Sequence, residues 1–143
     1  MVSVSVRKSR FSHHLIAENG EFTVNLPRVS DLDAVKYCGL KSGRDRNKFD
    51  DLNLTPVPCS PLEQAPMIGE FFHALGCRVR QVIELGSHDM FVAEVVSVHV
   101  RDQDRRTVRP EPHGEEQIVY LDGKYWQMAR IAEVHGENAA QVL

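Results

Sequence analysis

Two long runs rich in Val, Ile and Phe, separated by a short turn, place the strongest constraint on the fold of this 143-residue chain. They extend from Leu75 to Glu84 and from His88 to Arg101, and the letters "ELGSH" around their junction are typical of a turn. The second run carries apolar side chains on both faces, because successive residues of a strand point to opposite sides. We therefore expect two long antiparallel strands in a small barrel, with a helix or a second subunit over the outer face.

Shorter patterns before this pair predict two more strands with a helix between them. "MVSVSVR" at the start and "EFTVNLP" at residues 21–27 alternate apolar and polar side chains, which is typical of half-buried strands. Phe11, Leu15 and Ile16 share one side of a helix of about two turns, for which Gly20 is a suitable end.

The rest of the chain contains local signals for a helix, a loop and a hairpin. Ser30 followed by Asp33 resembles a capping box and predicts a helix that begins there. Four prolines within residues 55–66 predict an extended loop. "IVYLDGKYWQM" predicts a hairpin whose turn is Asp122-Gly123.

Composition limits the partners and the setting of the protein. A formal net charge of -3 gives no electrostatic case for nucleic-acid binding, and no apolar run has the length of a membrane span. Three cysteines at wide spacings indicate neither a disulfide framework nor a metal site. We therefore expect one domain in a reducing, cytoplasmic setting, with no metal, no nucleic acid and no membrane as partner.

The first candidate site is a cluster of cations and hydroxyls between the first strand and the helix. Its members are Arg7, Lys8, Ser9, Arg10 and Ser12. A helix start offers free backbone N–H groups and a positive dipole end, so this composition suits a phosphate. The alternative is that Ser9 or Ser12 merely caps the helix while the cations are solvated, and the local pattern alone favours that alternative.

A second candidate is the stretch "YCGLKSGRDRNKF" at residues 37–49. Its glycines permit unusual backbone angles and a close approach to a flat ligand, while its polar side chains supply donors. The side chains concerned are Ser42, Arg44, Asp45 and Lys48. The alternative is a helix end followed by a capped turn.

Histidines supply the third candidate. His88 lies at a turn–strand boundary and could project towards a ligand, although a histidine in such a place is more often a surface residue. Its neighbours Ser87 and Asp89 point in alternate directions along a strand, so these three residues cannot form a catalytic triad. His13 and His14 are adjacent and point to different sides of the predicted helix.

Taken together and in this order, these stretches resemble one known family. The segments are "VSVSVRKSRFSHHLIAENGEFTVNLP", "YCGLKSGRDRNKFDDLNLTP" and "LGCRVRQVIELGSHDMFVAEVVSVHV". They closely resemble the flavin reductase-like proteins of the FMN-binding split-barrel superfamily, which include the flavoredoxins. "IVYLDGKYW" resembles the last barrel strand of that family. The resemblance thus covers residues 1–126 as one domain and leaves 127–143 as a C-terminal tail that could be helical.

The resemblance implies a fold and an assembly. The fold is mainly β: a six-stranded, Greek-key antiparallel split barrel with short flanking helices. Family members usually begin further upstream of "MVSVSV", so the resemblance also implies that N-terminal strands are missing here. It implies a homodimer with FMN, or alternatively FAD, bound near the subunit interface. Hydride or electrons would pass from NADH or NADPH to this flavin, and onward to an acceptor protein such as a flavin-dependent monooxygenase.

The resemblance also carries site residues over by position. The "SVRKSRFS" stretch is similar to the flavin phosphate and ribityl region, with Arg7, Ser9, Arg10 and Ser12. The "SGRDRNKF" stretch is similar to the loop beside the isoalloxazine ring, with Ser42, Gly43, Arg44, Asp45 and Lys48. His88 matches a histidine near the flavin and the nicotinamide, and it is the residue for which the resemblance implies a catalytic role.

Two other functions remain open beside a flavin reductase. One is an FMN-binding electron carrier without efficient NAD(P)H turnover, and the other is a truncated homologue that binds no flavin. The chain carries no Gly-x-Gly-x-x-Gly fingerprint for a dinucleotide, so the local pattern does not separate these functions.

Overall fold

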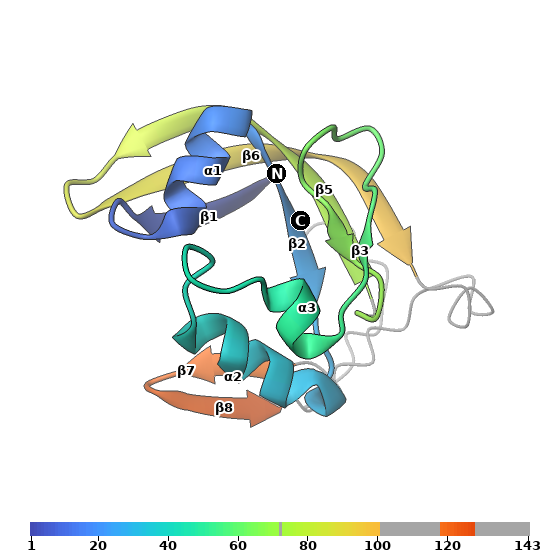
Figure 1. The fold of residues 1–143 in the computed structure, drawn as a ribbon. Coiled ribbons are helices and arrows are strands. Elements are labelled where there is room, and N and C mark those ends of the chain that lie inside the picture. Colours follow the sequence, from blue (N-terminus) through green and yellow to red (C-terminus); the bar gives the residue numbers. More distant parts are fainter. Residues whose placement is uncertain (72, 101–117, 128–143) are drawn as a thin grey trace, which may run out of the picture.

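A computed structural model describes residues 1–71, 73–100 and 118–127, and its main element is an antiparallel sheet of four strands (Figure 1). The strand order is β1-β6-β5-β2. The strands are β1 Val2–Arg7, β2 Glu21–Leu26, β5 His73–Glu84 and β6 His88–Val100. The sheet curls into a half-barrel, which confirms the predicted mainly β antiparallel architecture. Arg101, at the end of the second predicted run, and the predicted tail from residue 128 onward lie outside the described residues.

The β5–β6 hairpin is the longest paired element and confirms the two runs predicted from the sequence. Gly86 adopts a positive φ of 75° in its turn, where the Leu85 N–H donates to the His88 carbonyl at 2.9 Å. The pairing register shifts between residues 76 and 77 and again between 79 and 81. Because bulges of this kind bend a strand and increase its twist, they account for the curl of the sheet.

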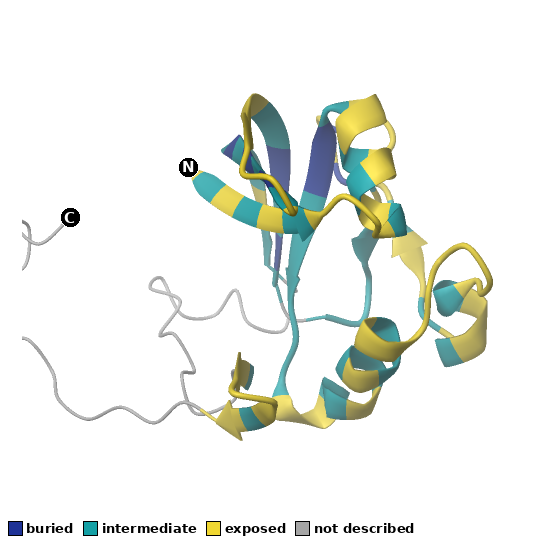
Figure 2. Cartoon of the chain, turned by 90° about the vertical axis from the view of Figure 1, so that its left-hand side faces the viewer, coloured by how far each residue is buried: buried dark blue, intermediate teal, exposed yellow. Residues whose placement is uncertain are grey.

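The core lies where the helix α1 (Phe11–Asn19) packs against the sheet. Its buried cluster consists of Phe22, Cys77, Phe91 and Ala93. The valines of β1 pack against this cluster while the residues between them are exposed, which confirms the predicted alternation. Figure 2 shows most of the buried residues within the sheet, and Cys59 and Leu62 are buried outside it, whereas the α-helices carry none. α1 ends at Gly20 as predicted, with a φ of 68°.

The polar side of β2 holds a proline-rich segment, residues 56–68, here called the strap. One oxygen of the Glu21 carboxylate accepts hydrogen bonds from three consecutive backbone N–H groups of the strap. These donors belong to Glu63, Gln64 and Ala65, at 2.9, 2.5 and 3.0 Å. Glu21 is only 8 % exposed. Its carboxylate therefore accepts from three backbone N–H groups that would otherwise need water as their acceptor.

Two further side chains of β2 extend this attachment along the strand. Thr23 donates to the Pro66 carbonyl at 2.8 Å, and the Asn25 side-chain oxygen accepts from the Ile68 N–H at 2.9 Å. The predicted extended loop is therefore more ordered than its prolines indicate. It contains the short paired strands β3 (Pro56–Val57) and β4 (Met67–Ile68).

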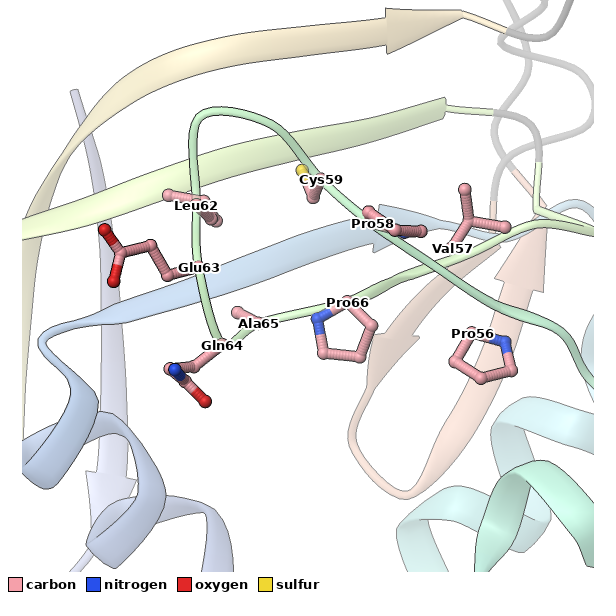
Figure 3. A pocket seen from close by; sticks show the side chains of 9 residues that line it. All are labelled: Pro56, Val57, Pro58, Cys59, Leu62, Glu63, Gln64, Ala65 and Pro66. Atoms are coloured by element: carbon pink, nitrogen blue, oxygen red, sulfur yellow. The ribbon is translucent and has the colours of Figure 1, made fainter.

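A cavity of about 230 Å³ lies along the strap (Figure 3). Its lining is mostly apolar and includes Pro56, Val57, Pro58, Cys59, Leu62, Glu63, Gln64, Ala65 and Pro66. Cys59 is 1 % exposed and lies over Gly76 of β5. A Cβ on Gly76 would overlap the Ser97 hydroxyl and lie 3.0 Å from the Cys59 sulfur, so glycine allows the strap to approach the sheet this closely.

Three short helical elements connect β2 to the strap. They are the 3₁₀-helix η1 (Val29–Asp31), α2 (Leu32–Leu40) and α3 (Lys48–Leu52). The prediction that Ser30 and Asp33 form a capping box is wrong, because the Arg28 N–H donates to the Asp31 carboxylate at 2.8 Å instead. No helix in the described ranges is long and apolar enough to cross a membrane.

The predicted hairpin around Asp122-Gly123 is confirmed. β7 (Ile118–Leu121) pairs with β8 (Lys124–Gln127), and both turn residues have positive φ, at 51° and 73°. This hairpin is a two-stranded sheet of its own, so the predicted last barrel strand does not extend the four-stranded sheet over the described residues.

Candidate functional site

A cleft of about 590 Å³ lies between the start of α1 and residues 41–47, here called the cleft loop. The loop joins α2 to α3, and in Figure 1 it extends from α2 towards α1. The lining combines aromatic, apolar and charged side chains: Phe11, Ser12, Leu15, Gly43, Arg44, Asp45, Arg46, Asn47, Lys48 and Phe49. Half of these residues, namely Ser12, Gly43, Arg44, Asp45 and Lys48, are sites proposed from the sequence.

The two sides of the cleft meet at Phe11. A Cβ on Gly43 would lie 3.1 Å from the Phe11 ring, so glycine is what allows the loop backbone to approach the helix start. The Arg44 guanidinium lies 5.8 Å from the centre of the same ring, and its Nη1 donates to the Ser9 carbonyl at 3.3 Å. Arg44 therefore bridges two segments that are 35 positions apart in the sequence.

The charge of Arg44 is not neutralised by an acid. Both of its side-chain partners, a carbonyl oxygen and an aromatic ring, are formally neutral. Among the described residues, no carboxylate pairs with Arg44 or with Arg10 at the start of α1. Because a guanidinium presents several donors in one plane, Arg44 favours an anionic ligand in the cleft, and Arg10, which does not line the cleft, adds positive charge at the start of α1.

Other predicted residues of the cleft loop support its shape. The Ser42 hydroxyl accepts from the Arg44 N–H at 3.2 Å. The Lys48 ammonium donates to the Cys38 carbonyl at 2.8 Å, so it binds an otherwise unpaired carbonyl in the last turn of α2. The alternative predicted for this stretch, a helix end followed by a turn, is thus present together with the cleft.

A second set of contacts holds the far end of the loop. Tyr37 donates to the Asp51 carboxylate at 2.5 Å, and Arg46 donates to the same oxygen at 3.0 Å. These contacts, with Tyr37 as the larger cause, hold the pKa of Asp51 below its usual value. The Asn47 side chain caps α3 by accepting from the Phe49 N–H at 3.2 Å. Arg46 and Asn47 therefore hold the loop and the start of α3 in place, more than Arg44 does.

The start of α1 has no capping side chain. Arg10 occupies the cap position, and neither Ser9 nor Ser12 accepts a hydrogen bond there. The alternative that these serines are caps is therefore wrong. Ser12 lies in the first turn of the helix, where the first backbone N–H groups have no acceptor within the helix.

Arg7 and His88 are opposite each other at the ends of β1 and β6. The Arg10 N–H donates to the Arg7 carbonyl at 2.9 Å, which places this pair beside the segment that leads into α1. The nearer ring nitrogen of His88 lies 2.9 Å from the Ser87 hydroxyl. Neither Arg7 nor His88 lines the cleft, so their roles at a ligand stay predictions.

A buried carboxylate lies directly behind these residues. Asp89 is 6 % exposed, and its Oδ2 lies 2.7 Å from the His13 ring nitrogen, while Lys8 lies 3.3 Å from Oδ1. Lys8 is equally close to Glu84. The hydrogen bond from His13 is the main cause that lowers the pKa of Asp89, against the effect of burial, and Lys8 adds to it. His13 also packs edge-on against Phe91, with ring centres 5.3 Å apart.

We expect acid to remove the stability that Asp89 contributes. Since the folded pKa lies below the ordinary 3.8, the unfolded carboxyl takes up a proton first as the pH falls. The contribution is therefore complete above pH 3.8 and is lost as the pH falls through the lower folded value. Denaturant unfolding of the wild type and of Asp89→Asn over a pH series measures it. The difference in the free energy of unfolding should narrow below pH 3.8.

The control for this pH series is Asp33→Asn. The Asp33 side chain is fully exposed and lies 3.7 Å from Lys36, so its difference from the wild type should be small at every pH. If the difference in the free energy of unfolding between the wild type and Asp89→Asn does not narrow in acid, the ionised carboxylate is not the stabilising form.

Sequence patterns missed two parts of this site. The sequence predicts only a helix stripe for Phe11 and Leu15, and it gives Phe49 no role of its own within the candidate stretch 37–49, yet all three line the cleft. The different directions of His13 and His14 were predicted correctly, since His14 pairs with Glu18 on the exposed side. That His13 would meet Asp89, 76 positions away, has no signal in the local sequence.

Comparisons with known proteins identify the family and the fold of this chain. The family model described as "Flavin reductase like domain" matches residues 1–129. A curated relative, an uncharacterized protein of Archaeoglobus fulgidus, is 38% identical over 98 residues, which cover 68% of this chain and 55% of the relative. The chain spans about half the length of the curated relatives it matches.

Solved structures show the same fold. Flavoredoxin from Methanosarcina acetivorans matches with a TM-score of 0.81 and 28% identity, over 99% of this chain and 75% of that one. Flavoredoxin of Desulfovibrio vulgaris (Miyazaki F) matches with a TM-score of 0.82 and 26% identity, over 96% and 75%. The resemblance stated from the sequence is therefore confirmed. With its curled, mainly β sheet and short helices, this chain belongs to the flavin reductase-like domain family.

Proposed function

We propose that this chain binds a flavin in the cleft between α1 and the cleft loop and transfers electrons to it from NADH or NADPH. The observation that carries the proposal is the Arg44 bridge, in which a cation with no acidic partner in the described part of the chain joins the two sides of the cleft. Family membership and the likeness to two flavoredoxins support the same class of cofactor. FMN is the flavin we favour, and FAD is the alternative.

The residues present fit the parts of a flavin. Arg10 and Arg44 supply positive charge, and the start of α1 supplies backbone donors without a capping side chain. Phe11 offers an aromatic surface beside Gly43. We assign the phosphate and ribityl chain to Arg7, Ser9, Arg10 and Ser12. We assign the ring system to the cleft-loop side, with Ser42, Gly43, Arg44, Asp45 and Lys48.

A bound flavin supplies the redox chemistry, because it accepts electrons and passes them on. The protein then has to bind the flavin, orient it and place donors where negative charge grows. Lys48 is one such donor in our proposal, since its ammonium has three N–H groups and one contact to Cys38 leaves others for a ligand. We propose that His88 orients the nicotinamide.

Replacing Arg44 by methionine should weaken FMN binding about tenfold, because a hydrogen bond made by a charged group contributes roughly 1.5–3 kcal/mol. Methionine keeps most of the length of the side chain and removes its charge. Titration of the purified protein with FMN, followed by quenching of flavin fluorescence, measures the dissociation constant. The wild type should quench the fluorescence in a saturable manner.

The matched control is Arg80→Met, which removes the same charge from β5, where Arg80 pairs with Glu94 outside the cleft. FMN affinity should be unchanged in this variant. A wild type that produces no saturable change in flavin fluorescence would refute the proposed function. Equal losses in the two variants would refute the role of Arg44.

A second candidate is an electron carrier that holds FMN but turns over nicotinamides slowly. The likeness to two flavoredoxins over nearly the whole chain supports this second candidate. Anaerobic reduction of the FMN-loaded protein separates the two functions. Rapid bleaching of the flavin absorbance by NADH or NADPH indicates a reductase, whereas bleaching by light but not by nicotinamides indicates a carrier.

We also propose a homodimer and an acceptor protein for the electrons. The apolar second face of β6 motivates a homodimer, and Val98 on that strand is 62% exposed. A flavin-dependent monooxygenase or another acceptor protein would receive the electrons. All three cysteines are free thiols, which is consistent with the reducing, cytoplasmic setting expected from the sequence.

A further inference from the structure

Three ionisable side chains, each adjacent in sequence to a residue proposed to contact the flavin or the nicotinamide, meet at the buried carboxylate of one of them. They are Lys8, His13 and Asp89. Lys8 lies within the proposed phosphate-binding segment, residues 7–12, and His13 follows that segment directly. Asp89 follows His88 on β6. The residues proposed to contact the ligand are therefore interspersed along the chain with residues whose side chains contact Asp89 and so hold the backbone in place.

Asp89 is the centre of these contacts. It is 6 % exposed, receives the short hydrogen bond from His13 at 2.7 Å and lies 3.3 Å from the Lys8 ammonium. Its Oδ1 is buried and has the Lys8 ammonium as its ion-pair partner. A buried carboxylate is costly unless it is paired, so its two cationic or proton-donating partners are held tightly in return.

The helix that carries the proposed phosphate contacts has few other attachments to the sheet. No residue of α1 is buried, and among its hydrophobic residues only Ile16 packs against the core cluster, beside the ring contact of His13 with Phe91. Ile16 lies a full turn further along the helix than Ser12. The position of the first turn thus depends strongly on the contact between His13 and Asp89.

We propose that Asp89 is a positioning residue that holds segment 7–12 in the place where it binds the phosphate of the flavin. This inference rests on the proposed function. Asp89 does not touch the ligand in this arrangement. It acts through Lys8 and His13, which keep the backbone between them in one conformation. Loss of the carboxylate would free the segment while leaving its phosphate-facing side chains chemically intact.

The test compares FMN with riboflavin, which has the same ring system but no phosphate. In Asp89→Asn the dissociation constant for FMN should rise about tenfold, and that for riboflavin should stay unchanged. The matched control is Glu94→Gln, which removes a carboxylate from another ion pair of β6, and it should change neither constant. Equal weakening of both ligands in Asp89→Asn would mean a general loss of structure and would overturn the inference.

A double-mutant cycle tests whether Asp89 acts through His13. His13→Gln should reproduce the selective loss of FMN affinity, and the double variant should lose little more than either single variant. Additive losses would overturn the inference, because two independent roles add and a shared contact does not.

Hydrogen exchange of the free protein separates this inference from the proposed function. Backbone amides of residues 8–13 should exchange faster in Asp89→Asn than in the wild type and in Glu94→Gln. If the wild type binds neither flavin, the proposed function fails, and faster exchange would still support the positioning role of Asp89. Unchanged exchange over residues 8–13 would overturn that role, whatever the flavin titrations show.

Discussion

Replacing Phe91 by alanine should lower the free energy of unfolding by about 3–5 kcal/mol, the largest loss we expect from one substitution in this chain. Phe91 is fully buried in the cluster that joins β6 to β2 and β5. Its ring also supports His13, so the substitution removes a contact beneath the first turn of α1. Removal of a buried ring costs the transfer free energy of its carbons and leaves a cavity that the curled sheet can only partly close. Urea unfolding, followed by far-ultraviolet circular dichroism, measures the loss.

Two variants calibrate this result. Phe91→Leu keeps most of the volume and should cost less than about 1.5 kcal/mol. Val82→Ala removes methyl groups from the neighbouring strand β5 at a residue that is 48% exposed, and its effect should stay within about 0.5 kcal/mol. If Phe91→Ala were no more destabilising than Val82→Ala, the packed core would not lie between α1 and the sheet.

The strands of the main sheet could be predicted because their signals are periodic. Val2, Val4 and Val6 alternate with polar residues, and the structure places these valines against the core and the intervening residues outside. The β5–β6 pair follows from two long apolar runs around a glycine turn. In each case the pattern of single residues corresponds directly to which side of a strand is buried.

The strap could not be predicted, because its attachment depends on contacts that have no period. The alternation of Glu21, Thr23 and Asn25 indicated a solvent-facing side of β2, yet these side chains bond the backbone of the strap. Backbone groups more than forty positions away are the partners, and backbone atoms have no signature in the sequence. The four prolines correctly indicated an extended path but not the surface on which it lies.

The candidate site was predicted in composition rather than in arrangement. Family resemblance selected ten residues, and five of them line one cleft, namely Ser12, Gly43, Arg44, Asp45 and Lys48. The other five, Arg7, Ser9, Arg10, Ser42 and His88, do not line it. Local patterns could not show that Arg44 would cross to Phe11, or that Lys48 would be held by the end of α2. Such pairings depend on the path of the whole chain between them.

Replacing Glu21 by alanine should release the strap from β2 and lower the free energy of unfolding by about 3 kcal/mol. The carboxylate accepts three backbone N–H groups at once, and each donor left without a partner in a partly buried place costs about 1 kcal/mol or more. Glu21→Gln keeps a side-chain carbonyl that can still accept these bonds without the charge, so its loss should be smaller. Denaturant unfolding ranks the variants, and hydrogen exchange at residues 63–65 reports where the structure opens.

The strap itself provides the matched control for Glu21. Glu63 lies in the strap with its side chain exposed, and only its backbone N–H takes part in the contact with Glu21. Glu63→Ala should therefore leave both the stability and the exchange at residues 63–65 close to the wild-type values. Because the strap and the cleft lie on different segments of the chain, Glu21→Ala should also leave FMN affinity unchanged below its unfolding transition. Slow exchange at residues 63–65 in Glu21→Ala would mean that other contacts hold the strap, and that the buried carboxylate is not its main attachment.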